Sequence, residues 1–445
     1  MSFENQRNPI LPLEHHVPDG EAHVMPDGKL YIYGSYDLLE GLYCSEEYHV
    51  VSTGDMKHWE VHPVSLRGQD VPWVNDPDAP KYPGIDWTHP TPFIQKMLSE
   101  TPEEKEAFEA EDTSPKRPLL FAPDCLPRNG KYYLYFCLSD DSEGVAVSDS
   151  PTGPFTDPIQ LPCGGIDPAV FIDDDGQAYY YWGQLSSHGV KLHEDMISFQ
   201  GEVADNLVTE ERHFFHEGSS MRKIGDTYYY VYADMERGKP TSLGYATGKS
   251  PLGPFTYRGI IVDNDNCDPA SWNNHGSIEQ VNGQWYVFYH RCSRGRKEYR
   301  RLCIEKIEIL PDGRIPEVKM TSQGVGEPFA PWEKIMGYQA CEVHGGCYID
   351  ADDTYGETLT HVASGSRAVF RYVKSDNGWK GISITAKGKG RLTVLMNEKE
   401  VGEVPIDSAD WCAFHGKISA PAGEYELSLA ARENTELELA EVTLF

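Results

Sequence analysis

The sequence lacks the features that mark several large classes of protein. None of its 445 residues belongs to an apolar run long enough to span a bilayer, which takes about 18 residues. Its ten cysteines form no CxxC pair and no zinc-ligand spacing, and the motifs GxxxxGK[ST] and GxSxG are missing. A membrane-spanning protein, a zinc protein, a P-loop enzyme and a GxSxG hydrolase are therefore not predicted.

Positive charge is also scarce. The chain has 39 lysine and arginine residues against 70 aspartate and glutamate residues, which gives a net charge of −31. Such a chain repels nucleic acid and anionic membranes, so neither is an expected partner. Solubility alone explains the charge, and a neutral substrate such as a sugar is compatible with it.

The first residues, MSFENQRNPILPLEHH, show no basic segment and no apolar run of the kind found in a secretory signal. Several cysteines fall inside predicted strands, for example Cys137 and Cys303. We therefore expect free, mostly buried thiols and a cytoplasmic protein.

Turn residues and tyrosine are abundant, with 41 glycines, 31 prolines and 26 tyrosines. They are organised in five copies of one pattern: a short strand, a tight turn that contains glycine, and an aromatic strand. The copies are GEAHVMPDGKLYIYGSYD (20–37), APDCLPRNGKYYLYFCLSD (122–140), DPAVFIDDDGQAYYYWG (167–183), EGSSMRKIGDTYYYVYAD (217–234) and HGSIEQVNGQWYVFYHR (275–291). A second predicted hairpin follows most copies. A four-stranded unit repeated every 40 to 50 residues or so is typical of a β-propeller.

The interval between the first two copies is the longest, so blade one is expected to carry an insertion at about 63–118. A helix is predicted there, because Thr101-Pro102-Glu103-Glu104 forms a capping box. Trp73 and Trp87 are candidates to stack on a sugar ring. They are equally good candidates to pack the insertion against the blade.

The pattern changes near residue 338. From there, short alternating strands are predicted at 367–373, 381–388, 391–397, 424–431 and 436–445. We therefore predict an all-β protein. A five-bladed β-propeller occupies residues 1–330, and a β-sandwich, jelly-roll-like domain occupies residues 338–445.

A chemically active residue stands just before the first strand of each copy. These residues are Asp19, Asp124, Asp167, Glu217 and His275. The innermost strands of propeller blades meet around one axis, so residues at their starts converge on one mouth of the central channel. A turn-forming or strand-capping role explains any one of them, but four carboxylates and an imidazole together indicate a site.

Carboxylates gathered around a pocket supply what glycosidic cleavage needs. One must be protonated to donate to the leaving oxygen, and one must stay ionised to activate water. A third negative charge beside the acid keeps it protonated at neutral pH. Carboxylates and a histidine also bind cations, so a structural calcium ion touching His275 is the competing explanation for part of the cluster.

The five copies, in this order, resemble glycoside hydrolase family 43 over about residues 1–325. The motifs that carry the resemblance are PDGEAH, FAPD, GGIDPAVF, HEGSS and NNHGS. It implies an inverting mechanism that requires no cofactor. By the same resemblance Asp19 is the general base, Asp167 tunes the acid and orients the substrate, and Glu217 is the general acid.

The resemblance also implies pocket roles for Asp124 and His275. Arg300, or its neighbour Arg301, matches an arginine that contacts sugar hydroxyls. Two motifs depart from the family pattern, because PDGEAH lacks a common proline and EGSS replaces the common EGP. Neither change removes a carboxylate. Inversion needs room for a water, so the carboxyl groups of Asp19 and Glu217 are expected ~6.5–9.5 Å apart.

These observations predict a glycoside hydrolase acting on arabinose- or xylose-containing oligosaccharides. α-L-Arabinofuranosidase activity is the first expectation and β-xylosidase activity the second, both from the family's common activities. A propeller that binds sugar without cleaving it, or that serves only as an interaction scaffold, is the alternative. The C-terminal domain resembles carbohydrate-binding modules of family 6. Trp379 and Trp411 are its candidate stacking residues, with a place in its core as the alternative.

Overall fold

The computed structural model describes residues 1–37, 43–82, 84, 95–96 and 117–445. Much of the predicted insertion, including Trp87 and the capping box at 101–104, lies outside the described residues. Within the described part of the chain, no helix is long and apolar enough to cross a membrane. The ten cysteines are unpaired, and all but Cys412 are buried.

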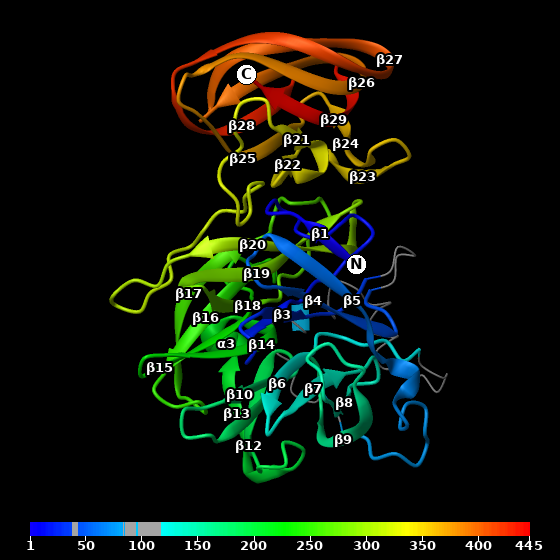
Figure 1. Cartoon of the computed structure of the whole chain (residues 1–445), viewed down its shortest axis with the longest axis vertical. Coiled ribbons are helices and arrows are strands. Elements are labelled where there is room, and N and C mark those ends of the chain that lie inside the picture. The colour runs from blue at the N-terminus through cyan, green and yellow to red at the C-terminus, as the bar shows by residue number, and fades with distance from the viewer. Residues whose placement is uncertain (38–42, 83, 85–94, 97–116) are drawn as a thin grey trace.

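Five antiparallel sheets make up the N-terminal domain (Figure 1). Blade one contains β2 (Glu21–Val24), β3 (Leu30–Tyr33), β4 (Glu47–Thr53) and β5 (His58–Arg67), with β1 (Ser2–Glu4) on its outer edge. Blade two contains β6 (Asp124–Arg128), β7 (Lys131–Cys137), β8 (Ser142–Ser148) and β9 (Thr156–Gly164). Blade three contains β10 (Ala169–Ile172), β11 (Ala178–Trp182), β12 (Ser186–Leu192) and β13 (Phe199–Thr209). Blade four follows the short helix α3 (Glu210–His213) and contains β14 (Phe215–Ile224), β15 (Thr227–Asp234), β16 (Ser242–Gly248) and β17 (Phe255–Asp263).

Blade five has three strands: β18 (Ser277–Val281), β19 (Gln284–Ser293) and β20 (Arg296–Ile307). The outer edge of β20 is covered by the N-terminal lead-in, because the Asn8 side chain bonds the backbone N–H and C=O of Ile304 and Ile10 N–H donates to Leu302 O. The sequence RLCIEKIEILPDGRI (301–315) predicts a second hairpin after the fifth copy, but among the described residues no fourth strand completes this blade. After β20 the chain turns away, and Val318 bridges to Val262 at the edge of blade four.

The innermost strands form a closed ring, since β2, β6, β10, β14 and β18 each contact the next and β18 contacts β2. A separate hydrophobic cluster fills the space between each pair of neighbouring blades. Tyrosines of the aromatic strands supply much of this packing; Tyr180, Tyr181 and Tyr230, for example, are fully buried. The predicted five-bladed propeller is confirmed.

Tight turns set the register of these hairpins. Asn129 and Gly130 have φ of 51° and 77°, and Asn282 and Gly283 have φ of 51° and 85°. Two successive positive φ angles define the turn whose twist matches paired strands. The Asn-Gly pairs in the sequence therefore fix where β6 and β7, and β18 and β19, pair.

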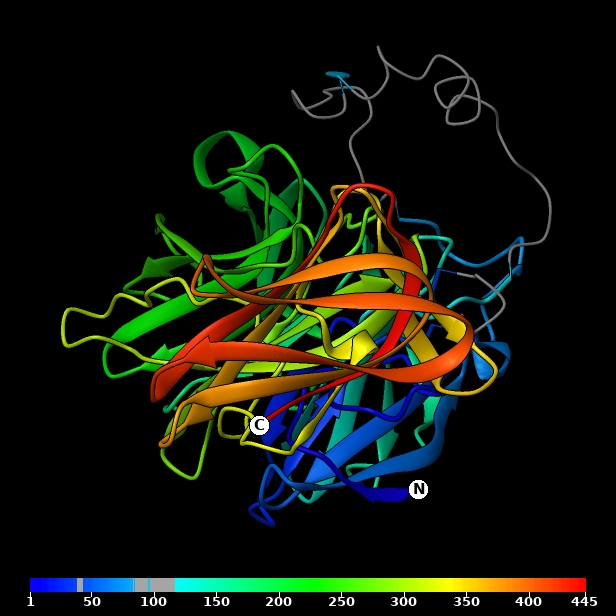
Figure 2. The same ribbon diagram turned by 90° about the horizontal axis from the view of Figure 1, so that it is seen from above.

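The C-terminal domain is one antiparallel sheet that curls into a nearly closed barrel or sandwich (Figures 1 and 2). Its strands are β21 (Lys334–Met336), β22 (Glu342–His344), β23 (Tyr348–Asp352), β24 (Gly356–Ala363), β25 (Arg367–Ser375), β26 (Trp379–Met396), β27 (Lys399–Ala420), β28 (Gly423–Ala431) and β29 (Glu436–Leu444). The two strands expected at 381–388 and 391–397 are a single long strand, β26. It pairs with β27, a strand that the sequence pattern did not reveal.

The two tryptophans proposed to stack on sugar in this domain do not lie free on its surface. Trp379 is 2% exposed and belongs to the domain's hydrophobic core. Trp411 is partly buried, with the Lys387 ammonium 4.6 Å from its ring centroid and Tyr355 edge-on to it at 5.1 Å. For Trp379, the core explanation is therefore the correct one.

Candidate active site

Asp19 lies just before β2, in the left-handed backbone region with φ of 58°, and is 4% exposed. Arg300 Nη1 donates to both of its carboxylate oxygens at 2.8 Å, and Ser35 Oγ donates to Oδ2 at 2.7 Å. Burial alone raises the pKa of Asp19, but the charge of Arg300, together with the nearby His290 and His275 rings and the Ser35 hydrogen bond, outweighs burial, so the pKa of Asp19 lies below its usual range. Asp19 is therefore held as a carboxylate.

Arg300 is the arginine that reaches this site, and Arg301 is not. The guanidinium of Arg300 also binds Asp37, with Nη2 to Oδ1 at 2.9 Å and Nε to Oδ2 at 3.0 Å, and it lies 4.2 Å from the centroid of the Tyr43 ring. Arg301 faces the C-terminal domain instead, where it pairs with Glu357. Successive residues of strand β20 point to opposite faces, which explains the division.

Asp167 occupies the corresponding place before β10, again with a left-handed φ, of 55°. Its Oδ2 lies 3.6 Å from His275 Nδ1, and the same nitrogen lies 4.0 Å from Asp19 Oδ1. Burial raises the pKa of Asp167 well above its usual range, and the charges of Glu217 and Asp19 raise it further. Burial also lowers the pKa of His275, so the imidazole is neutral near pH 7.

Glu217 lies near the start of β14 and is held by two amides. Gln184 Nε2 donates to its Oε2 at 2.8 Å, and Asn273 Nδ2 donates to its Oε1 at 3.0 Å. The next residue, Gly218, has φ of 74°, and a Cβ there would lie 2.6 Å from the His275 ring. A glycine is therefore needed after the acid if His275 is to keep its position.

The three carboxylates lie in one cluster although they come from three blades. His275 lies within 4.0 Å of both Asp19 and Asp167. Asn273 bonds Glu217, and its own oxygens accept from His290 Nε2, whose Nδ1 lies 3.4 Å from Asp19 Oδ1. The structure thus brings together Asp19, Asp167, Glu217, His275 and Arg300.

Asp124 belongs to a different cluster. Its Oδ1 is 2.7 Å from His23 Nε2, and its Oδ2 accepts from the Val170 N–H at 2.7 Å. His23 is also 3.5 Å from Glu21, which Arg222 binds at 2.7 Å. Among the described residues, no hydrogen bond or ion pair joins Asp124 to the three carboxylates of the site.

Trp73 is 8% exposed and packs into the hydrophobic cluster between blades one and two. Its ring stacks on Phe136 with the planes 13° apart, and its Nε1 donates to Ser142 Oγ at 2.9 Å. Of the two alternatives for Trp73, packing is the one that the structure supports.

Several site residues were missed at the sequence level: Ser35, Asp37, Gln184, Asn273 and His290. A usable signal was present for four of them. In a hairpin, the second strand runs back to the end where the first began, so residues at or just after its end return to the same mouth. Ser35 and Asp37 end the first repeat, Gln184 follows the third and His290 lies in the last residues of the fifth.

One group of side chains in the described residues has the spacing of a cation site: Glu21, His23 and Asp124. The Arg222 guanidinium already neutralises part of its charge. Among the residues that the structure describes, two carboxylates, those of Asp19 and Asp167, lie within 4.0 Å of His275, where a calcium ion was expected as an alternative, and that calcium ion stays a prediction.

A propeller that gathers three buried carboxylates, one ionised and two in mutual repulsion, has the groups that a glycoside hydrolase needs, and the comparisons with known proteins show that class. Residues 98–315 match the family model described as glycosyl hydrolases family 43. A xylosidase/arabinosidase from Bacteroides ovatus is 30% identical over 67% of this chain and 94% of its own length. The chain belongs to glycosyl hydrolase family 43.

Other relatives extend the similarity. A xylosidase/arabinosidase from Thermoclostridium stercorarium is 29% identical over 98% of both chains, so the match includes the C-terminal domain. The crystal structure of a β-xylosidase/α-arabinofuranosidase from a compost metagenome, in complex with xylotriose, is 29% identical, covers 72% of this chain and 99% of its own, and has a TM-score of 0.55. An arabinoxylan arabinofuranohydrolase from Bacillus subtilis, solved with cellotetraose, shares the fold over 98% of this chain at a TM-score of 0.53 and 23% identity.

Proposed function

We propose that this protein removes terminal arabinofuranosyl residues from arabinose- and xylose-containing oligosaccharides, with inversion at the anomeric carbon. The observation that carries the proposal is the unequal treatment of the three carboxylates. Asp19 is ion-paired to Arg300 and stays ionised, whereas Asp167 and Glu217 share a buried space in which two negative charges repel. Such a pair retains a proton that an isolated carboxylate would lose.

In the proposed reaction, Glu217 donates that proton to the glycosidic oxygen. Gln184 and Asn273 hold both of its oxygens, which fixes the direction in which the proton is delivered. Asp19 accepts a proton from a water on the opposite face of the sugar, and the water oxygen forms the new bond to the anomeric carbon. Asp167 is the second carboxylate of the pair, and its repulsion with Glu217 in a buried space retains the shared proton.

The chemistry proposed for these residues needs no cofactor. A calcium ion beside His275 remains the alternative for that residue, and a chelator would then lower activity. The cytoplasmic location rests on the unpaired, mostly buried cysteines.

β-Xylosidase activity is the second candidate. Two relatives that align with this chain over most of their own length are named xylosidase/arabinosidase. The test is turnover of nitrophenyl α-L-arabinofuranoside and nitrophenyl β-D-xyloside side by side. A higher kcat/KM on the arabinofuranoside supports the proposal, and a higher value on the xyloside favours the second candidate. Proton NMR of the first-formed sugar tests inversion, and a product that keeps the substrate's anomeric configuration contradicts the mechanism.

A further inference from the structure

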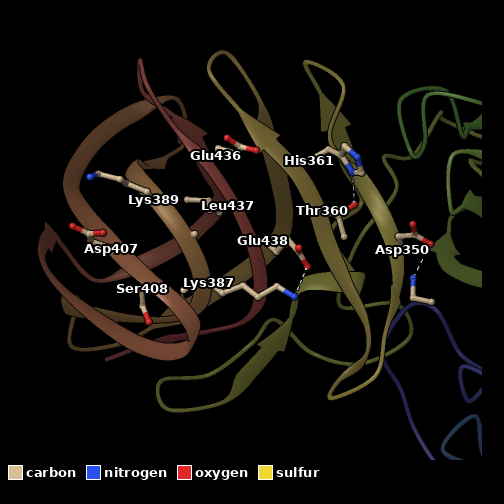
Figure 3. A pocket seen from close by; sticks show the side chains of 13 residues that line it. Asp350, Thr360, His361, Lys387, Lys389, Asp407, Ser408, Glu436, Leu437 and Glu438 are labelled. Atoms are coloured by element: carbon tan, nitrogen blue, oxygen red, sulfur yellow. Dashed lines mark hydrogen bonds and ion pairs between the residues drawn. The ribbon is translucent and has the colours of Figure 1, made fainter.

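Two pockets that share Asp350 form a groove on the C-terminal domain: one lies across its strands (Figure 3), and the other lies at the junction with blade five. Its two parts have volumes of about 730 and 610 Å3 and share Asp350. Strands β24, β26, β27 and β29 line the first part, and the propeller segment Arg294–Arg296 lines the second. Each part is in the size range of a small-ligand site.

A stacked aromatic pair joins the two parts of the groove. Tyr348 lines the part at the domain junction and His361 lines the other, and their rings are parallel within 19° at 4.8 Å. His361 is exposed, and Thr360 Oγ1 lies 2.9 Å from its Nδ1, which fixes the ring. A fixed, flat ring surface between polar walls suits the apolar face of a sugar ring.

The charges that line the groove are balanced, although the chain carries a net −31. The basic side chains are Lys387, Lys389, Arg294 and Arg296, and four acidic ones match them. Some are already paired, with Lys387 Nζ 3.1 Å from Glu438 and Arg294 Nη2 3.0 Å from Glu357. With neither sign in excess, the groove suits a neutral polyhydroxylated ligand better than an ion.

The groove is separate from the catalytic site. Tyr299 lines it, while the next residue, Arg300, binds Asp19. Consecutive strand residues point to opposite faces, so strand β20 stands between the two sites. A sugar chain bound at one is therefore not held by the other.

We propose that this groove is a second saccharide-binding site, which holds an arabinose- or xylose-containing oligosaccharide through the Tyr348–His361 pair. The class of ligand rests on the proposed function. The position of the site rests only on the groove, the aromatic pair and the charge balance. Neither Trp379 nor Trp411 lines this groove, so the proposed binding does not depend on them.

The test measures binding without turnover, in the full chain carrying Glu217→Gln. Calorimetric titration with xylohexaose and, separately, with arabinohexaose gives the stoichiometry. The groove is altered by Tyr348→Ser together with His361→Asn, because asparagine tolerates the left-handed φ of 54° found at residue 361. The matched control is Trp332→Ala, which removes an indole that is 70% exposed and does not line the groove.

Two sites per chain are expected in the parent and in Trp332→Ala, for at least one of the two sugars. One site is expected in the double variant, or an affinity at least tenfold weaker for the second site. His361→Asn alone is a milder change for use if the double variant does not fold, and it is expected to weaken binding at the second site about threefold. One site in the parent, two unchanged sites in the double variant, or an equal loss in Trp332→Ala overturns the proposal.

Failure of the proposed function would look different. In that case the wild-type chain would turn over neither nitrophenyl substrate, whatever the stoichiometry of the titrations. Normal turnover combined with a single binding site would overturn the groove alone.

Discussion

Two clusters of buried carboxylates lie in this propeller, and they begin two residues apart in the chain, just before β2 and at its first residue. Asp19 belongs to the cluster with Asp167 and Glu217, and Glu21 belongs to the cluster with His23 and Asp124. In the second cluster, Arg222 binds Glu21 and also lies 3.3 Å from Glu279, so cation and carboxylates are interleaved. In the first, the Arg300 guanidinium pairs with Asp19, and among the described residues no ion pair with arginine or lysine joins Asp167 or Glu217, which repel each other.

The comparison shows that gathering acids at a propeller axis is not sufficient for chemistry. The repeat places acids near the axis in both clusters. What differs is the guanidinium. Arg222 contacts Glu21 and Glu279, although burial still raises the pKa of Glu21 to about 7. In contrast, no ion pair among the described residues joins Arg300 to Asp167 or Glu217. Removing one member of an ion-paired cluster leaves a buried charge without a partner and destabilises the fold, whereas two carboxylates without a cation between them hold a proton that they can give away.

The largest expected effect comes from comparing one substitution in each cluster. Asp19→Asn removes the proposed base, and kcat/KM is expected to fall by about 10³-fold or more, at the upper part of the range for a positioned proton acceptor. Asp124→Asn removes a carboxylate of the other cluster, and kcat/KM is expected to stay within about tenfold of wild type while the melting temperature falls. Equal losses of activity in the two variants would contradict the division into a catalytic and a structural cluster.

Arg300→Met comes next. Arg300 is the main charge that lowers the pKa of Asp19 against the effect of burial, so its loss raises that pKa. A base with a higher pKa is protonated at higher pH, and the acidic limb of the kcat/KM profile should move to higher pH. Stability should also fall by ~3–5 kcal/mol, because two buried carboxylates lose their partner.

The neighbouring Arg301→Met is the matched control for this experiment. Arg301 pairs with Glu357 across the domain junction, so its loss is expected to lower stability and to leave the acidic limb in place. An acidic limb that moves in both variants would mean that it reports general destabilisation.

Asp167→Asn sharpens the claim that two acids share a proton. Without Asp167 there is no second carboxylate to share the retained proton, and the alkaline limb of the kcat/KM profile should move to lower pH. The sign follows from the raised pKa of Asp167, which burial causes first and repulsion from Glu217 second. A limb that stays in place or moves to higher pH would show that the two carboxylates do not interact.

Much of this arrangement could be predicted from sequence. The five copies of one hairpin predict the propeller. Asp19 and Asp167 could be placed because each stands just before the first strand of its copy, and a repeat has a fixed geometry. The partners of these acids could not be predicted in the same way. Arg300 is 281 positions from Asp19 in the chain, and no local pattern distinguishes it from Arg301 except the face on which it falls.

Side-chain burial was the other limit. Trp73, Trp379 and Trp411 look alike in sequence as possible stacking residues. Tertiary packing places Trp73 and Trp379 inside hydrophobic clusters. Local sequence carries no information about which neighbour will cover an indole.

The smallest expected effect concerns Trp73. Trp73→Phe keeps the stacking on Phe136 but removes the hydrogen bond to Ser142, which should cost ~1 kcal/mol of stability. KM for both nitrophenyl substrates should remain unchanged. A several-fold rise in KM without a change in melting temperature would restore the substrate-stacking role.

The most direct test of the central claim uses Glu217→Gln with two leaving groups of different basicity. Dinitrophenolate leaves without being protonated, whereas a sugar leaving group must receive a proton as it leaves. We expect kcat/KM to fall at least about 100-fold more for xylobiose or its arabinofuranosyl counterpart than for the dinitrophenyl glycoside of the same sugar. An equal fall for both substrates would show that Glu217 does not donate the proton, and would contradict the account of the site.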